Sequence, residues 1–309
     1  DTAEKYVESG YITKGGVYTF GNHEWYPSAG GDYANNEDHP AAEKLFRIGE
    51  VEKNDKYVLY CLGSAGSAQE YPTEDIETLK TYMKSAPTDV PVIIMTHFPL
   101  HSYSSRITNN SADVVEVLNN YPNVIFLWGH NHTSSDPRYD QIYKAGDTIE
   151  VAPNDMMEIN FTYCAAGCMS DSEYGPGSEF VKGKGLVIET NGKDVNLAYY
   201  TMGGEALENT ASLDMSSIGD SINADGPFTV KFMDGLDGSV IDEQTVEKEA
   251  SATEPAAPEH DGYVFTGWNR EFDNITGNTI VTALYEVKKV ALTGQSKLDE
   301  NYVYINLAT

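Results

Sequence analysis

Short apolar runs alternate with helical patterns along the first two-thirds of the chain. The apolar runs predict strands at Val17–Phe20, Tyr57–Leu62, Val90–Thr96 and Val124–Trp128. Between these runs, the spacing of apolar residues predicts helices capped by Asp38 and by Thr73 and a third helix over Ala112–Asn120. Strands that alternate with helices are typical of a layered α/β sheet. We therefore expect an α/β (α+β) sandwich in this part of the chain.

The pattern changes to strands alone further along the chain. Strands are predicted at Ile149–Val151, Gly185–Glu189 and Val195–Tyr200, with a hairpin turn at Asn191-Gly192. Residues 206–226 are rich in Gly, Ser, Ala, Asn and Asp and predict a linker. Alternating apolar residues beyond it predict a small all-β module. The expected domains are residues 1–205, the linker 206–226, a β module over 227–286, and the start of a further β domain over 287–309.

Composition and charge narrow the class of protein. Hydrophobic residues make up 40% of the 309 positions and aromatic residues 11%, as in ordinary globular proteins. The formal net charge is -28, which repels nucleic acid and anionic lipid, so we expect no nucleic-acid-binding surface. No apolar run approaches the roughly 18 residues of a membrane span, so we expect none.

The three cysteines are too few for a disulfide scaffold. Cys61 lies in an apolar run, and we expect it to be a buried free thiol. Cys164 and Cys168 could form a disulfide, half of a metal site or two thiols. With no other His or Cys spaced nearby, we favour the reduced state.

Three predicted strands end in polar motifs of similar kind. They run into Gly21–Glu24 (Gly-Asn-His-Glu), Thr96–Pro99 (Thr-His-Phe-Pro) and Gly129–His132 (Gly-His-Asn-His). In sheets built from strand–helix units, ligands collect at the carboxyl ends of the strands. We therefore expect the three motifs to converge on one crevice.

These motifs supply the ligand types that divalent transition metals prefer. Imidazole and the amide oxygen of Asn suit a first-row divalent ion. His130 and His132 are two residues apart, so each could serve one of two ions separated by about 3.5–4 Å. His101 follows Pro99, which argues against a helix that would bring it beside His97, and we assign it no site role. His39, next to Pro40, is interpreted as a surface residue at a helix start, and His260 is assigned no functional role.

In this order, the three motifs resemble the last three sequence blocks of the calcineurin-like metallophosphoesterases. The resemblance covers about residues 10–205 and implies that Asn22, His97 and His130 bind one metal ion and His132 its neighbour. It implies that His23 is the catalytic histidine, which contacts the phosphate and protonates the leaving oxygen. The cofactors would be two divalent ions, with Mn, Fe, Zn and Ni not distinguished. The substrate would be a phosphate ester.

One departure from the family pattern concerns the remaining ligands. Family members carry an Asp-x-His block and a Gly-Asp-x-x-Asp block on earlier strands, and nothing before Gly21 fits either. We therefore expect an N-terminally truncated domain. We also expect the 309-residue chain to bind metal weakly and to hydrolyse nothing by itself.

The second module resembles the Listeria–Bacteroides repeat of internalin-type bacterial surface proteins. The string Gly262–Trp268 (Gly-Tyr-Val-Phe-Thr-Gly-Trp) carries much of the match, and its aromatic residues are interpreted as core. The resemblance implies a small all-β, β-grasp-like fold. It also implies a secreted or cell-surface enzyme, with possible cell-wall association through the β modules.

The sequence thus predicts a secreted or cell-surface bacterial metallophosphoesterase that hydrolyses phosphate esters with a metal-bound hydroxide. One alternative is a surface adhesion or interaction protein whose phosphoesterase domain has lost catalysis, as the missing carboxylates would suggest. A second alternative is a mononuclear or structural metal protein that uses only the ligands present.

Overall fold

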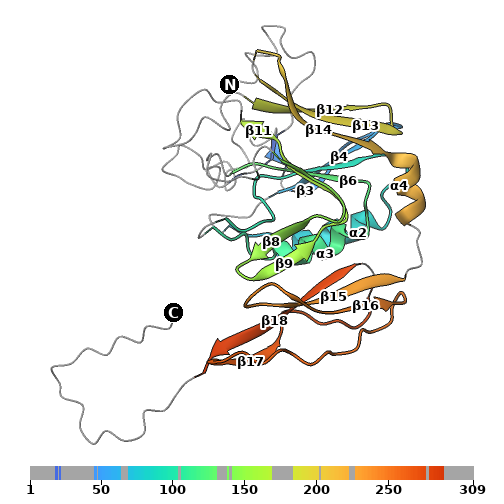
Figure 1. Ribbon diagram of the computed structural model, residues 1–309. Helices are drawn as coiled ribbons and strands as arrows, with labels where there is room; N and C mark the ends of the chain where they lie inside the picture. The colour runs from blue at the N-terminus through green and yellow to red at the C-terminus, as the bar shows by residue number, and fades with distance from the viewer. Residues whose placement is uncertain are drawn as a thin grey trace, which may run out of the picture.

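The fold consists of two layered units joined in sequence (Figure 1). The computed structural model describes residues 18–19, 21, 45–46, 48–63, 69–103, 106–130, 138, 141–168, 184–201, 203–222, 227–275 and 278–288. The predicted helix after Asp38 and most of the predicted domain over 287–309 lie outside these residues. Within them, no helix is long and apolar enough to cross a membrane.

The main sheet has six strands in the order β3-β4-β5-β6-β10-β7. Strands β4, β5, β6 and β10 run parallel, and β3 and β7 are antiparallel at the two edges. The strands are β3 (Ile48–Lys53), β4 (Val58–Leu62), β5 (Val92–Met95), β6 (Val124–Trp128), β7 (Ile142–Tyr143) and β10 (Thr162–Ala165). The strands predicted for β4, β5 and β6 are confirmed, and β6 has the predicted bounds.

Both faces of the main sheet are buried, which explains why its inner strands are apolar at almost every position. Along β6, Val124, Phe126 and Trp128 point into one hydrophobic cluster, whereas Ile125 points into another. The first cluster includes residues of helices α2 (Thr73–Met83) and α3 (Ser111–Leu118). These helices therefore cover one face of the sheet.

Helix α2 shows how local sequence fixes an element. Ile76, Leu79 and Met83 lie on its buried face at helical spacing. The residue at its N-cap is Pro72, in an extended conformation, and Thr73 is the first helical residue. The prediction that Thr73 is the cap is thus wrong by one residue, because the fixed φ of Pro72 already directs the chain into the helix.

A second sheet covers the other face of the main sheet. Its strands are β11 (Gly167–Cys168), β12 (Lys184–Thr190), β13 (Asp194–Thr201) and β14 (Ala206–Asp214), in that order and antiparallel. Val195 and Leu197 of β13 join Ile93 and Ile125 of the main sheet in one hydrophobic cluster. The domain is therefore a sandwich of mixed sheets with few helices, as far as the structure describes it.

The predicted hairpin between β12 and β13 is confirmed. Gly192 has a φ of 101°, a conformation that glycine adopts without strain. The side-chain Oδ1 of Asn191 accepts hydrogen bonds from the backbone N–H groups of Lys193 and Asp194. The turn is therefore closed by the side chain that precedes the glycine.

The predicted linker is wrong over residues 206–222. These residues form strand β14 and helix α4 (Met215–Ile222). Only Ala211 of β14 is fully buried, because β14 is an edge strand with its polar residues in solvent. That exposure explains why the segment has a polar composition despite being a strand. The outer domain boundaries remain predictions.

Two small sheets complete the first unit. Strands β1 (Tyr18–Thr19) and β2 (Leu45–Phe46) form a parallel pair. Strands β8 (Thr148–Ala152) and β9 (Asp155–Glu158) form a hairpin on the side of the helices (Figure 1). Met157 of β9 belongs to the same hydrophobic cluster as the helices.

The cysteines agree with the prediction where they are described. Cys61 and Cys164 are fully buried, and neither forms a disulfide. Burial raises the pKa of the Cys61 thiol to about 11 and also raises the pKa of Cys164. Both groups are therefore thiols at neutral pH. Nothing is described for the side chain of Cys168, so its predicted reduced state remains a prediction.

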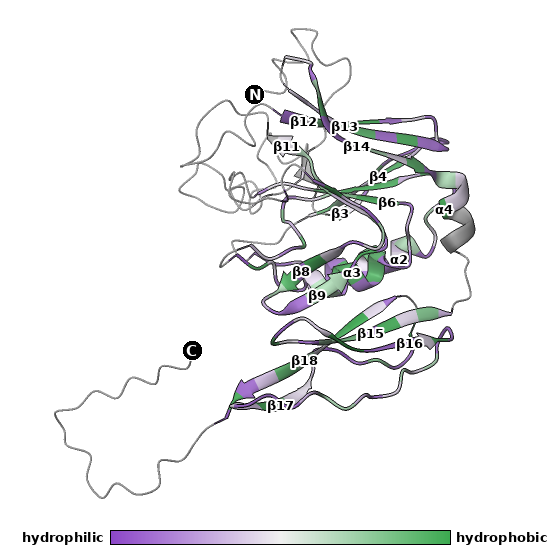
Figure 2. Cartoon of the chain, viewed as in Figure 1, coloured by the Kyte–Doolittle hydropathy of each residue, from purple (hydrophilic) through white to green (hydrophobic). Residues whose placement is uncertain are grey.

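The second unit is one four-stranded sheet in the order β16-β15-β18-β17. The strands are β15 (Phe228–Asp234), β16 (Val240–Val246), β17 (Tyr263–Trp268) and β18 (Thr279–Val287), with β15 and β18 parallel. Val230 and Phe232 pack with Trp268 and Phe272 in its core, and Figure 2 shows the hydrophobic stretches along β15. The predicted all-β character of this module is confirmed, whereas the β-grasp-like description remains a prediction.

Asp234, the last residue of β15, carries a buried carboxylate. The Oδ2 atom of Asp234 lies 2.6 Å from Nε2 of His260, and its Oδ1 accepts a hydrogen bond from the backbone N–H of Leu236. Burial alone would raise the pKa of Asp234, but these hydrogen bonds and the charge of His260 outweigh burial and hold the pKa below its usual value. The carboxylate is therefore ionised and partnered in the folded state.

This depressed pKa predicts an acid-sensitive contribution to stability. The contribution is present above the unfolded-state pKa of about 3.9 and disappears as pH falls through the lower folded-state pKa. We expect Asp234→Asn to cost about 1–3 kcal/mol at pH 7 and much less at pH 2. Urea unfolding of both proteins at pH 7 and pH 2 measures the difference. The control is Glu243→Gln, which changes an exposed carboxylate on β16. Its effect on the free energy of unfolding should not shrink in this way between pH 7 and pH 2. The prediction would be contradicted if Asp234→Asn lowered the free energy of unfolding by the same amount at both pH values.

Candidate metal centre

Two predicted site histidines follow neighbouring parallel strands of the main sheet. His97 lies two residues after β5 and His130 two residues after β6, and Met95 pairs with Leu127 in the ladder between these strands. Backbone hydrogen bonds continue past the strands, because Gly129 N–H donates to the carbonyl of His97 over 3.0 Å. The shared register therefore places the two histidines side by side at the carboxyl edge of the sheet.

The two imidazole rings face each other. The Nε2 atom of His97 lies 3.1 Å from the Nδ1 atom of His130, and the ring centroids are 5.0 Å apart. Both residues are half-buried. The ring of Phe98 packs edge-on against His130, with a centroid separation of 4.9 Å. The pair is thus held against an apolar wall and remains partly accessible.

His130 adopts a backbone conformation that is rare for a residue with a side chain. Its φ is 69°, in the left-handed region that favours glycine. Such strain persists only where the surrounding structure imposes it, and it occurs preferentially at functional sites. The strain therefore marks this strand end as a place where side-chain position matters.

The end of β1 also reaches this place. A Cβ atom built on Gly21 would lie 2.9 Å from both Cγ and Nδ1 of His97, closer than real Cβ atoms come to a ring. Gly21 is thus in close contact with the His97 ring. The described residues of the three predicted motifs therefore lie close together at this edge of the sheet. These residues are Gly21, His97, Gly129 and His130.

This close contact predicts a sharp difference between two glycine substitutions. Gly21→Ala must displace the His97 ring, and we expect metal affinity to fall by about 10–100-fold, as when a partner that orients a ligand is lost. Gly129→Ala is the matched control, because its Cβ would meet only the His97 carbonyl oxygen, at an ordinary 3.6 Å. Calorimetric titration of both variants with Mn²⁺ measures the difference. Equal losses in both variants would refute the steric argument.

Two tyrosines anchor the loop that carries His97. The hydroxyl of Tyr71 donates to the carbonyl of Phe98 over 2.5 Å, and the hydroxyl of Tyr163 accepts from the backbone N–H of Leu100 over 2.9 Å. Both tyrosines are fully buried, and burial raises the pKa of Tyr71, so its hydroxyl stays protonated and able to donate. No sequence motif marks either residue, because their role depends on contacts between segments that are distant in sequence.

His101 is part of this anchor. It is buried, its Nδ1 lies 2.7 Å from the hydroxyl of Tyr163, and its ring packs edge-on against Trp128. These contacts give His101 a place in the loop anchor, and its exclusion from the predicted site remains a prediction. His260, assigned no functional role, lies in the second unit beside Asp234.

The remaining predicted site residues, Asn22, His23 and His132, lie outside the described residues, as does His39. Within the described part of the chain, no group of three or more His, Cys, Asp or Glu side chains is placed to hold a metal ion. The histidine pair nevertheless fits one ion. Two nitrogen ligands bound to one ion at about 2.0–2.1 Å, and about 90–110° apart, lie about 2.8–3.4 Å from each other. The observed 3.1 Å falls in this range.

Comparisons with known proteins identify two domains. Residues 2–134 match the model of the calcineurin-like phosphoesterase family, and residues 228–289 match that of the Listeria-Bacteroides repeat domain. No curated protein matches the chain. The chain therefore carries a calcineurin-like phosphoesterase domain followed by a Listeria-Bacteroides repeat domain. The first of these families suggests metal-dependent hydrolysis of phosphoesters. Both predicted resemblances are confirmed.

Proposed function

We propose that this protein hydrolyses phosphate esters at a dinuclear metal centre on the carboxyl edge of the main sheet. The observation that carries the proposal is the facing pair His97 and His130, which the two parallel strands bring to 3.1 Å within the region that matches the phosphoesterase family. The strain at His130 and the tight contact of Gly21 with His97 support it.

The proposed ligands follow from the three motifs. Asn22, His97 and His130 would hold one divalent ion and His132 a second, with Mn, Fe, Zn and Ni all compatible with these ligands. When bound, the ions supply a hydroxide nucleophile and neutralise charge on the phosphoryl oxygens. The two carboxylate blocks that complete this ligand set in the family are absent from the 309 residues.

The chain's own residues have separate roles in this proposal. The anchored loop after β5 presents Nε2 of His97, and the left-handed backbone at His130 turns its Nδ1 toward the same point. His23 would contact the phosphate and protonate the leaving oxygen as general acid. The apolar ring of Phe98 packs against His130 and excludes water from that side of the pair. Electrostatic interactions are stronger there because the local dielectric constant is lower.

The second domain supports a proposal about where the protein acts. Listeria-Bacteroides repeats are typical of surface or extracellular proteins. We propose that the protein is a secreted or cell-surface bacterial enzyme, with possible association with the cell wall through its β modules. The acidic surface, with a net charge of -28, leaves nucleic acid an unfavourable partner.

The function is tested by metal-dependent hydrolysis of chromogenic phosphomonoesters and phosphodiesters. For the 309-residue chain we expect Mn²⁺ binding without turnover. For a protein that adds the Asp-x-His and Gly-Asp-x-x-Asp blocks we expect a metal-dependent rate that His23→Ala removes while Mn²⁺ binding remains. A protein with both blocks that binds two Mn²⁺ ions but is inert with every metal would support the non-catalytic surface protein instead. Binding of a single ion without turnover by that same protein would support the structural metal protein.

A further inference from the structure

The Listeria-Bacteroides repeat domain packs against the phosphoesterase domain. In Figure 1 its sheet lies beside the layer that holds α3 and the β8–β9 hairpin. The contact is made by the segment between β17 and β18, and strands β18 and β9 lie against each other. Asn278 Nδ2 donates to Glu158 Oε1 over 3.3 Å across this boundary.

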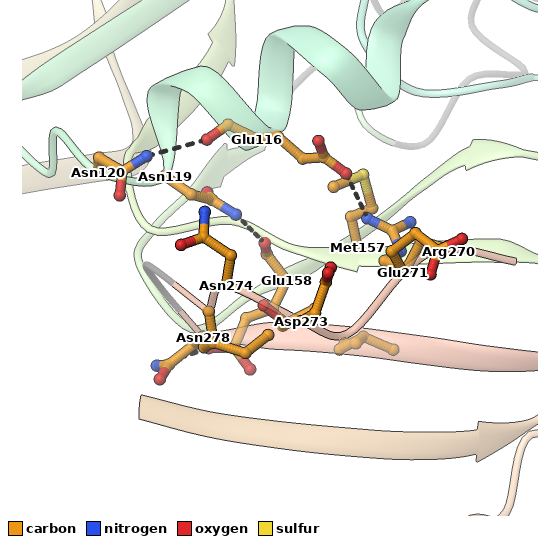
Figure 3. Close-up of a pocket in the computed structure, with 13 residues that line it drawn as sticks. Glu116, Asn119, Asn120, Met157, Glu158, Arg270, Glu271, Asp273, Asn274 and Asn278 are labelled. Atoms are coloured by element: carbon orange, nitrogen blue, oxygen red, sulfur yellow. Dashed lines mark hydrogen bonds and ion pairs between the residues drawn. The ribbon is translucent and has the colours of Figure 1, made fainter. Parts of the chain in front are cut away.

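Arg270 is the central residue of the contact. Its Nη2 lies 2.7 Å from Oδ1 of Asp155. Its Nη1 lies 3.4 Å from Oε1 of Glu116, and Figure 3 shows this second contact. Only 10% of the Arg270 side chain is exposed. The neighbouring Asn269 donates to the same Asp155 oxygen over 2.6 Å. One carboxylate of the phosphoesterase domain is thus held by two consecutive side chains of the repeat.

The surroundings of Arg270 are strongly acidic. A cavity of about 400 Å³ lies at the boundary, and Arg270 is the one cationic side chain among the residues that line it. The carboxylates that line it are Glu116, Glu158, Glu271 and Asp273, two from each domain. Burial raises the pKa of Glu116, and the charge of Arg270 opposes that rise. Without Arg270, carboxylates from the two domains would face each other across a cavity whose lining, among the described residues, holds no other cationic side chain.

We propose that Arg270 is an electrostatic latch that holds the repeat domain docked on α3 and β9, so that the two domains behave as one body. Removing one partner of a buried ion pair leaves an uncompensated charge and is strongly unfavourable. An arginine suits this position because its planar guanidinium reaches two carboxylates at once. The repeat is then a fixed side domain of the enzyme and not a flexible spacer.

The latch is separate from the candidate metal centre. It contacts α3 and β9, whereas His97 and His130 follow β5 and β6. Helix α3 precedes β6, so the carboxyl end of α3 lies toward the amino end of that strand, away from His130. The proposal therefore stands independently of the proposed hydrolysis.

The test compares the full chain with Arg270→Gln and with Lys231→Gln. Lys231 is the matched control, because it loses the same charge within the repeat, where it pairs with Glu243 on the next strand. Small-angle X-ray scattering measures the overall dimensions, and limited proteolysis measures cleavage at residues 223–227, between α4 and β15. We expect larger dimensions and about tenfold faster cleavage for Arg270→Gln, since a tenfold larger undocked population corresponds to about 1.4 kcal/mol. Lys231→Gln should behave as the unmodified chain.

Two further variants separate undocking from unfolding of the repeat. Asp155→Asn removes the partner from the phosphoesterase domain, so the repeat is unchanged, and we expect the same expansion and faster cleavage. The exchange Arg270→Asp with Asp155→Arg should restore part of the compact dimensions. Compact scattering and slow cleavage for both Arg270→Gln and Asp155→Asn would overturn the proposal. An equal expansion and equally fast cleavage for Lys231→Gln would also overturn the proposal. Loss of any positive charge from the repeat domain would then have the same effect as loss of Arg270 at the domain boundary.

Discussion

His97→Ala is expected to weaken Mn²⁺ binding by more than about 100-fold, which is the largest effect on metal affinity that we anticipate. Loss of a residue that only orients a ligand typically costs 10–100-fold, and His97 would be a ligand itself. Its Nε2 lies 3.1 Å from Nδ1 of His130, so the change removes one of two facing donors. Calorimetric titration with Mn²⁺ measures the affinity directly.

The control for this change is another histidine. His260→Ala removes an imidazole from the repeat domain, where it contacts Asp234, and should leave Mn²⁺ affinity unchanged. A second comparison uses the backbone of His130. Both His130→Ala and His130→Gly should lose metal affinity. The free energy of unfolding of His130→Gly should exceed that of His130→Ala by about 1 kcal/mol, because glycine adopts a φ of 69° without strain. Metal binding that survives His97→Ala would refute the assignment of this centre.

Phe126→Ala is expected to lower the free energy of unfolding by about 3–5 kcal/mol, the largest effect on stability that we anticipate. The Phe126 side chain is fully buried in β6, an inner strand of the main sheet. Its ring packs near Phe161 and Tyr163, with centroids 6.3 and 5.8 Å away. Truncation leaves a cavity between the sheet and its helical layer, which rigid neighbours fill only in part.

Urea unfolding followed by near-ultraviolet circular dichroism measures this loss. Val187→Ala is the control, because Val187 lies on the second sheet with 42% of its surface exposed and should cost no more than about 0.5 kcal/mol. Since Phe126 shares a strand with the residues that lead to His130, the variant should also bind Mn²⁺ less tightly. Similar stabilities of the two variants would contradict the assignment of Phe126 to the core.

The inner strands could be predicted from sequence because their burial is complete. β5 and β6 are apolar on both faces, so each appears as an uninterrupted run with clear bounds. Strand β14 was missed because it is an edge strand whose single fully buried residue is Ala211. Most of its other residues are exposed, and the strand resembles a linker in composition. Local pattern thus identifies a strand only to the degree that neighbours cover it.

In the candidate site, too, some residues could be predicted from the sequence and others could not. The motifs at the strand ends predicted that His97 and His130 would meet, because the carboxyl ends of parallel strands share one edge. The anchors Tyr71 and Tyr163 could not be predicted, since each contacts a loop far away in sequence. The latch at Arg270 was equally hidden, because it depends on how two domains dock. These contacts are tertiary, and no local signal encodes them.

The strand order of the main sheet has a consequence for how the chain folds during synthesis. Strand β7 leaves the ribosome before β10, yet β10 lies between β7 and β6 in the finished sheet. A newly made chain could therefore pair β7 with the open edge of β6 and block the place of β10. At two residues, β7 is too short to hold that edge firmly, whereas β10 pairs with β6 at four positions. The brevity of β7 thus leaves a premature pairing easy to displace, and the last inner strand can still enter.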